Sequence, residues 1–188
     1  MRSIFAVLLI VSAAVATGCD DATDFTIDPL LATDTVEIAA PGAAGGLPSA
    51  LDVIATGGVI GGGRFPEQAR DAEQWDVALR VRNGALVFVP APALGLQSRA
   101  SMTPALSGET FTSLVEAPGA GTFRSDSARV VQQGAIYAIR SRDIASQFGS
   151  CIQYAKIQPL TVDVAAARVR LQVTTNERCS DPRLAEEG

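Results

Sequence analysis

Histidine is absent from this chain of 188 residues, and lysine occurs once, at Lys156. Without histidine, neither a Ser-His-Asp triad nor a Cys-His pair can form, so the common routes to nucleophilic catalysis are excluded. The formal net charge is −5 at pH 7, which makes nucleic acid and anionic lipid head groups poor partners. We therefore predict a protein that is not an enzyme and does not bind nucleic acid.

Long apolar runs are also scarce. Only residues 4–15 form one, directly after Met1-Arg2, and these twelve residues are too few to span a bilayer, which takes about 20. A short apolar run behind a positive charge is typical of a secretory signal. We expect an exported protein with no membrane-spanning segment in the rest of the chain.

The apolar run ends in Val15-Ala16-Thr17-Gly18-Cys19, which resembles the lipobox of bacterial lipoproteins, with Ala16 where that class more often has leucine. The resemblance implies a lipoprotein signal peptide over residues 1–18, cleavage before Cys19, and acylation of the Cys19 sulfur and the new amino group. Two or three acyl chains hold far better than one, because each buried CH₂ contributes about 0.8 kcal/mol. The alternative is an ordinary signal peptide that leaves Cys19 as a free thiol.

The cysteine count agrees with lipidation. Three cysteines in an exported chain leave one over. If Cys19 carries lipid, Cys151 and Cys179 form an even pair in an oxidising compartment, and we predict a disulfide between them. The alternative is two buried free thiols.

Residues 19–50 are rich in Asp, Thr, Ala, Gly and Pro. This composition buries little apolar surface, so we predict a flexible tether with a reach of roughly 30 Å. The four aspartates between residues 20 and 28 lack the spacing and the glycine of an EF-hand, so no metal site is predicted. Residues 51–188 are then the folded domain.

The last third of the chain predicts a β-hairpin with arms at residues 151–162 and 168–179. In the second arm Val169, Leu171 and Val173 alternate with polar residues, the period of a half-buried strand. If Cys151 lies opposite Cys179, the same register pairs further residues: Ala155 with Thr175, Ile157 with Val173, and Pro159 with Leu171.

A second hairpin is predicted at residues 75–89, around Asn83-Gly84, the strongest short-range hairpin signal. One face would carry Trp75, Val77, Leu79, Val81, Leu86 and Phe88. The opposite face would carry Asp76, Arg80 and Arg82. We expect Trp75 to anchor the core.

Further short strands are predicted at residues 51–55, 122–124, 128–131 and 135–140. The glycines of residues 57–63 lack the ending of a phosphate-binding loop and are interpreted as a flexible turn. Single helical turns are expected at residues 66–74 and 109–116. These short strands predict an all-β fold, with antiparallel meanders forming a sandwich or a barrel-like domain.

Three acidic residues surround Trp75: Asp71, Glu73 and Asp76. A pair of carboxylates is all that a glycosidase needs. Acids before a strand are more often a solvated edge, which is the interpretation we prefer.

Two stretches resemble the HmuY-like family of bacterial surface lipoproteins, which bind haem. Trp75-Asp-Val-Ala-Leu79 is similar to that family's Trp-Asp-Ile-Ala-Phe strand. Residues 135–143, followed by Tyr154-Ala-Lys-Ile157 and a valine-rich strand, are similar to its strand, turn and Tyr-Ala-Lys-Ile strand. The resemblance implies two packed meanders with a haem pocket between loops.

Haem iron is held by strong axial ligands such as His, Met, Cys or Tyr. The family's founding type uses two histidines, and this chain has none. The remaining candidates are Met102, Tyr137 and Tyr154. Met102 is expected in a polar loop, as a surface or gap-filling residue, and both tyrosines lie in strand patterns where core packing is the default.

Together these patterns predict a non-enzymatic, lipid-anchored β-domain of the cell envelope that binds a ligand or partner. The expected partners are the membrane, through the Cys19 lipid, and either haem, as the resemblance suggests, or an envelope protein. The alternative is a structural or assembly lipoprotein with no small-molecule ligand. Asp20 resembles an inner-membrane retention signal of some bacteria, but the choice between inner and outer membrane stays open.

Overall fold

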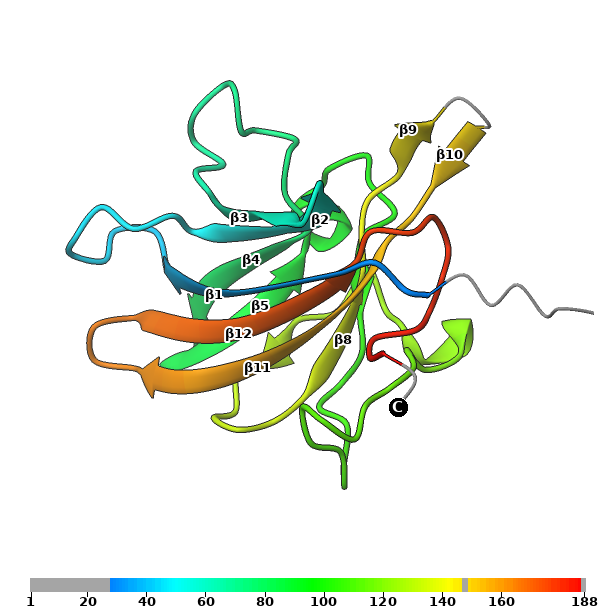
Figure 1. Ribbon diagram of the computed structural model, residues 1–188. Helices are drawn as coiled ribbons and strands as arrows, with labels where there is room; N and C mark the ends of the chain where they lie inside the picture. The colour runs from blue at the N-terminus through cyan, green and yellow to red at the C-terminus, as the bar shows by residue number, and fades with distance from the viewer. Residues whose placement is uncertain (1–27, 147–148, 187–188) are drawn as a thin grey trace, which may run out of the picture.

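The computed structural model describes residues 28–146 and 149–186, which form two five-stranded sheets and a small hairpin (Figure 1). Neighbouring strands are antiparallel throughout, so the all-β prediction is confirmed. Sheet A has the order β1-β12-β11-β8-β6, with strands Leu31–Ala39, Arg168–Asn176, Tyr154–Asp163, Tyr137–Arg140 and Ser101–Met102.

Sheet B packs against sheet A and has the order β3-β2-β4-β5-β7. Its strands are Val59–Arg64, Ala50–Thr56, Val77–Arg82, Ala85–Pro90 and Arg129–Val130. The separate hairpin consists of β9 (Ile144–Ser146) and β10 (Gly149–Cys151), and the only helical elements in the described residues are the 3₁₀ turns η1 (Ala91–Leu94) and η2 (Ala120–Thr122). No helix within residues 28–146 and 149–186 is long and apolar enough to span a membrane.

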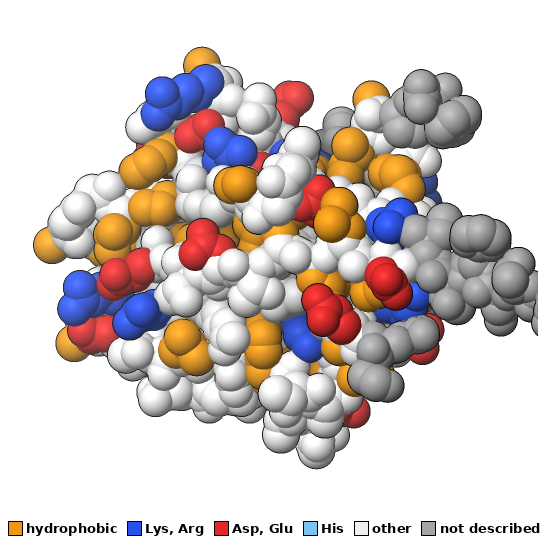
Figure 2. Space-filling view, viewed as in Figure 1, with side chains coloured by type: hydrophobic (Ala, Val, Ile, Leu, Met, Phe, Trp, Pro, Cys, Tyr) orange, Lys and Arg blue, Asp and Glu red, His pale blue; other side chains and the backbone are white. Residues whose placement is uncertain are grey.

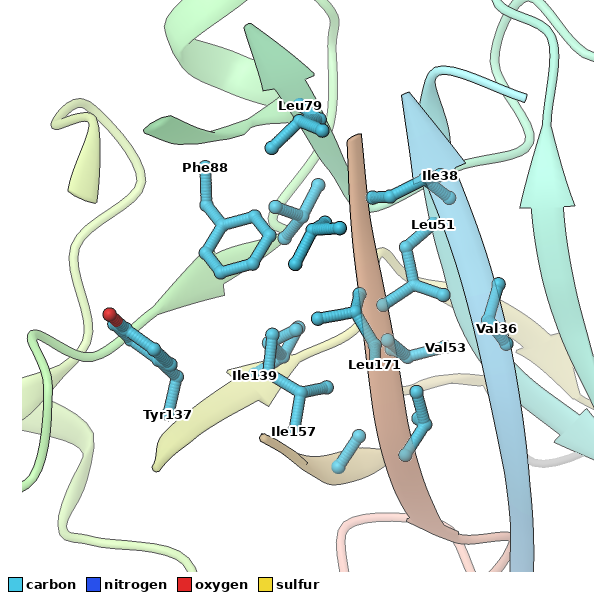
Figure 3. Close-up of a cluster of buried hydrophobic side chains, with 14 of the residues drawn as sticks. Val36, Ile38, Leu51, Val53, Leu79, Phe88, Tyr137, Ile139, Ile157 and Leu171 are labelled. Carbon is cyan, nitrogen blue, oxygen red and sulfur yellow. The ribbon is translucent and has the colours of Figure 1, made fainter. Parts of the chain in front are cut away.

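Apolar side chains of both sheets meet in one core (Figure 3). Phe88 of sheet B and Tyr137 of sheet A pack edge to face, with ring centroids 5.5 Å apart. Ile139, Ile157 and Leu171 are fully buried in the same cluster. Because each sheet buries one face against the other, the molecule is a β-sandwich.

The closing hairpin of β11 and β12 has the predicted register. Ala155 lies opposite Thr175, Ile157 opposite Val173, and Pro159 opposite Leu171. The register then shifts by one residue, because Thr161 pairs with Arg170 and Leu160 is left as a bulge. The predicted register therefore holds from Tyr154 to Pro159 and ends at the bulge.

Strand β1 corrects the tether prediction. Residues 31–39 pair along their whole length with β12, from Leu31 opposite Asn176 to Ala39 opposite Arg168. Ile38 is fully buried while Glu37 is exposed, the alternation of a half-buried strand. Without β1, the backbone groups on that side of β12 would be an unpaired edge, so pairing outweighs the flexible composition. Residues 1–27, with the predicted signal peptide and Cys19, lie outside the described residues.

The glycine-rich segment is also more ordered than predicted, because β3 includes Gly61, Gly62 and Gly63. A Cβ on Gly61 would lie 2.3 Å from Cγ of Asp52, and a Cβ on Gly63 would lie 2.2 Å from Cγ of Pro48. Glycine at these two positions thus allows close packing within the sheet edge. Only Gly57 and Gly58 form the turn before it, with φ of 60° and 83°.

The Asn83-Gly84 hairpin is confirmed, since Arg82 pairs with Ala85 and both turn residues have positive φ, 53° and 77°. Its predicted face is correct for Val77 and Leu79, which join the main core. Trp75 is buried, but in a separate cluster with Ala50, Ala78, Ala91 and Ala100. The predicted face is wrong for Val81, which is 53% exposed.

The remaining local predictions are partly correct. Residues 66–74 form a series of turns without an α-helix, and residues 109–116 contain one turn closed by Leu114 N donating to Thr110 O at 3.2 Å. The strand expected at residues 122–124 is reduced to a bridge between Arg124 and Met102.

A second cluster, on the other face of sheet A, covers the chain's one lysine. Lys156 is 4% exposed, and its Nζ donates to the carbonyl oxygen of Leu114 at 3.0 Å. The same nitrogen lies 4.8 Å from the ring centre of Phe111, a cation–π contact. Burial lowers the pKa of Lys156. The loop before β7 is thereby held against the sheet.

Candidate functional site

The predicted cysteine pair is bonded: the sulfur atoms of Cys151 and Cys179 are 2.11 Å apart and their Cα atoms 5.3 Å apart. Both residues lie just beyond the paired arms of β11 and β12, which begin at Tyr154 and end at Asn176. The disulfide therefore connects β10 to the turn that follows β12.

Met102 does not lie in a polar loop. It belongs to β6, has no solvent exposure, and exchanges backbone hydrogen bonds of 3.1 and 2.9 Å with Arg124. Pairing of β6 with β8 directs the side chain into the main core beside Tyr137. The surface position expected for Met102 is wrong, and its packing role is that of a gap-filling residue.

The two tyrosines lie in different clusters. The Tyr137 hydroxyl donates to Val130 O at 2.8 Å and accepts from Gln132 N at 3.1 Å, and burial raises its pKa. Tyr154 packs on the other face of sheet A, with its ring centroid 6.1 Å from that of Phe123. The structure thus brings Met102 and Tyr137 together and places Tyr154 elsewhere.

These positions do not fit haem ligation. Met102 and Tyr137 are fully buried, and the Tyr137 hydroxyl already has two backbone partners. None of the three candidate ligands lines a cavity described below. An axial ligand must reach the iron in an open pocket, and none of these three side chains faces such a pocket.

A cluster that the sequence did not reveal lies where β2, β3 and the connection after β8 meet. We call it the Arg142 cluster, and it consists of Asp52, Arg64, Asp76 and Arg142. Asp76, expected to point to solvent, is fully buried. One of its carboxylate oxygens accepts from Arg142 N at 2.7 Å, and the other accepts from Val53 N at 2.9 Å and Arg142 Nη1 at 3.2 Å.

Asp52 binds both arginines of the cluster. Its Oδ1 accepts from Arg142 Nη1 at 2.9 Å, and its Oδ2 accepts from Arg64 Nη2 at 2.8 Å and Nε at 3.1 Å. The carboxylate is held against Gly61, where a side chain would displace it. The one local hydrogen bond of this carboxylate comes from Ile54 N, two residues on, which donates to Oδ1 at 3.0 Å. Aspartate often makes such a bond, so it did not point to the cluster.

The acids around Trp75 do not form a solvated edge. Asp71 and Asp76 are buried, and only Glu73 is exposed. Asp71 accepts from Phe65 N at 3.1 Å, which closes the turns of residues 65–74. The prediction failed because Asp76 has donors 23 and 66 residues away, and because Asp71 is enclosed by the turns that it closes.

The electrostatics of the cluster follow from its burial. Loss of water raises the pKa of Asp76 to about 6, with Arg142 acting in the opposite direction and Asp52 in the same direction. Burial also disfavours the charge on Arg142, but the carboxylates of Asp76 and Asp52 raise its pKa overall. Neither carboxylate has an accessible oxygen for acid–base chemistry, because backbone and guanidinium donors surround both.

The Arg142 cluster fastens the connection after β8 to sheet B. Gln153 reinforces it, with Nε2 donating to Ala55 O at 2.9 Å and Oε1 accepting from Ala55 N at 2.7 Å. Hollows of about 460 Å³ and about 270 Å³ lie on either side of Arg142, bordered by Gln74 and by Trp75 respectively. Within the described ranges, no three side chains of metal-ligating type are placed to hold a metal ion.

Comparison with family models, with curated proteins and with solved structures finds no match. The resemblance to the HmuY-like family therefore stays a prediction from the residues.

Proposed function

We propose that the protein is a lipid-anchored β-domain of the bacterial cell envelope that binds a ligand or partner without catalysing a reaction. One observation carries the proposal. The bond between Cys151 and Cys179 uses two of the three cysteines, so Cys19 is the cysteine left for lipidation, and it ends the short apolar run. An exported cysteine outside a disulfide needs an explanation, and the lipobox-like sequence supplies one.

The course of β1 supports an anchored arrangement. The chain enters the fold at Leu31, whose partner Asn176 pairs with Tyr154, which in turn pairs with Arg140. We call this the tether end of the molecule. Nine residues of β1, at about 3.3 Å each, then reach about 30 Å to the opposite end, with the β11–β12 turn and loop 40–48 (Figure 1). A lipid on Cys19 would hold the tether end toward the membrane.

The charges of both signs on the surface of sheet A do not favour attraction to anionic lipid. Figure 2 shows acidic and basic side chains mixed at the left of this face, where the β11–β12 turn lies. Arg168 is 3.6 Å from both Glu37 and Asp163, so its charge is balanced locally. The acyl chains, rather than a basic patch, would supply the membrane affinity.

Export of the full-length chain tests the anchor. The mature protein should partition into detergent and should exceed the mass of residues 19–188 by its acyl chains. The Cys19→Ser variant should lose both properties, whereas Ser12→Ala, within the apolar run, should keep them. A mature wild-type protein without acyl mass in the aqueous phase would contradict the proposal.

The structural or assembly lipoprotein is the second candidate, favoured by the positions of Met102, Tyr137 and Tyr154 away from the described cavities. A haem titration separates it from the haem-binding role. We expect no Soret shift at micromolar haem. A saturable shift that is lost in Met102→Leu or Tyr154→Phe would instead support haem binding.

A further inference from the structure

A hollow of about 510 Å³ lies at the far end of β1, larger than either hollow beside Arg142. We call it the distal hollow. Loop 40–48 forms one wall, residues 65–67 form the other, and Ser49 and Arg80 form the floor. Small-molecule sites in proteins have volumes of roughly 300–1,000 Å³, and this hollow lies within that range.

The walls of the distal hollow are apolar. Pro41, Ala43 and Leu47 line the loop side, and Phe65 and Pro66 line the opposite side. The loop is held at its base, where Ala39 N donates to Pro48 O and Ala40 N donates to Ala167 O, both at 2.8 Å. Because the loop is already held in place, a hydrocarbon ligand can pack against these walls without the entropic cost of ordering the loop.

The floor contains a buried hydroxyl with no hydrogen-bond partner. Ser49 is 4% exposed, and its Oγ contacts no donor or acceptor in the described part of the chain. Its backbone is fixed, because Ser49 N donates to Arg64 O at 3.0 Å and Ser49 O accepts from Leu79 N at 2.9 Å. The hydroxyl oxygen has almost no exposed surface, so it does not reach a ligand in the hollow, and the polar contact of the floor comes from Arg80.

Arg80 lies beside the backbone of Ser49. Its Nη1 donates to Leu79 O at 2.8 Å and reaches Ser49 O at 3.5 Å. Among residues 28–146 and 149–186, no carboxylate forms an ion pair with Arg80. The half-buried guanidinium therefore keeps Nε and Nη2 for an anionic acceptor, and arginine stays protonated at neutral pH.

One acidic group opposes this attraction. Glu67 is exposed at the rim of the distal hollow. Burial lowers the pKa of Arg80, whereas the charge of Glu67 acts in the opposite direction and that of Arg82 acts in the same direction as burial. A ligand with a single negative charge suits this balance better than a multiply charged anion.

We propose that the distal hollow binds a small monocarboxylate with an apolar body. The carboxylate binds the guanidinium of Arg80, and the carbon chain packs against Leu47 and Phe65. This assignment rests on the binding role proposed above and is independent of the lipid anchor. A site at the far end of β1 would face away from the membrane in the anchored protein.

Titration of the mature protein with hexanoate and with the neutral hexanamide tests the proposal. Hexanoate should bind saturably and at least about tenfold more tightly than hexanamide, because charge-assisted hydrogen bonds are the stronger ones. N-acetyl-leucine, which presents the carboxylate of a peptide end, identifies the source. Tighter binding of N-acetyl-leucine indicates a peptide terminus, and tighter binding of hexanoate indicates a free acid.

Three variants with matched controls locate the site. Arg80→Gln should weaken hexanoate binding about tenfold or more, whereas Arg82→Gln, on the same strand outside the hollow, should not. Ser49→Ala should leave binding unchanged, since it removes a hydroxyl that does not reach the hollow. Glu67→Gln should strengthen binding.

Two results would overturn the proposal. One is no saturable binding of hexanoate up to about 10 mM, where the binding free energy is too small to matter. The other is equal affinity of wild type and Arg80→Gln for hexanoate, together with equal affinity for hexanoate and hexanamide. Neither result bears on lipidation, which the fractionation experiment tests separately.

Discussion

Among single residues, Asp76 lies where β2, β4 and the connection after β8 meet. Its carboxylate accepts from Val53 of β2 and from Arg142 of that connection. Its sequence neighbours Trp75 and Val77 are both buried as well. Alternation places Asp76 on the face opposite Val77, but it cannot predict that partners 23 and 66 residues away bury the carboxylate there.

The pKa of Asp76 makes stability depend on pH in a defined window. With a folded-state pKa of about 6 against an ordinary value of 3.8, the folded state binds a proton that the unfolded state has released between pH 4 and 6. This contribution to the free energy of unfolding therefore falls as pH rises from 4 to 6, by about 2–3 kcal/mol. Denaturant unfolding of wild type and Asp76→Asn across this range measures it.

The expected outcome is that the advantage of wild type over Asp76→Asn shrinks as pH rises from 4 to 6. Asp181 provides an internal control, because the hydrogen bond from Arg183 lowers its pKa to about 2. Its stabilising contribution is present above pH 4 and is lost only as pH falls toward 2. A wild-type advantage that stays constant from pH 4 to 6 would contradict the assignment to Asp76.

Gly61 offers a second test at this scale. A methyl group there would meet Cγ and Oδ2 of Asp52 at 2.3 Å, so Gly61→Ala must displace the carboxylate from Arg64 and Arg142. We expect a loss of about 2–4 kcal/mol in the free energy of unfolding. Gly119→Ala is the matched control, since no atom lies within 4 Å of the added carbon and φ is −54°. Equal effects of the two substitutions would exclude the close packing.

Among the elements, the two hairpins were predictable because their signals are local. Asn83-Gly84 dictates its turn, and the alternation of β12 determines which residues face the core. Strand β1 was not predictable from composition, because only the four residues Val36 to Ala39 carry a strand pattern. The rest is held by backbone pairing, by burial of Ala32 and by the hydrogen bond between the hydroxyls of Thr33 and Thr174 at 2.7 Å. The bulge at Leu160 follows Pro159, which has no backbone N–H to donate, and proline within a strand is typical of a bulge.

Substitutions in β1 distinguish a strand from a tether. Ile38→Ala should lower the free energy of unfolding by about 2–4 kcal/mol, because the side chain is fully buried between the sheets. Glu37→Ala, on the opposite face of the same strand, should change it by less than about 0.5 kcal/mol. Thermal or urea unfolding measures both. A negligible effect of Ile38→Ala would restore the tether interpretation of residues 31–39.

For the whole molecule, sequence reasoning found the architecture and the cysteine pair but not the polar clusters. Sheet A and sheet B are each assembled from distant segments, so the Arg142 cluster and the distal hollow depend on contacts that no local pattern encodes. Met102 shows the same limit, since a two-residue strand at the end of sheet A placed it in the core.

Removal of the disulfide tests how the tether end is held together. Cys151→Ser with Cys179→Ser should lower the free energy of unfolding by about 3–4 kcal/mol, because the closed loop of 28 residues restricts the unfolded chain. Cys19→Ser is the control and should leave the stability of the folded domain unchanged. Reductant should reproduce the loss in wild type and have no effect on the double variant. Stability that is unaffected by both treatments would show that the bond is dispensable.

The burial of Lys156 has a practical consequence for chemical labelling. Its amine is enclosed by Leu114 and Phe111, and an acylated Cys19 would carry no free amine either. Succinimide esters and aldehyde fixatives would then find almost nothing to modify on the native molecule. Incorporation of such a reagent at Lys156 would report opening of the loop that covers it.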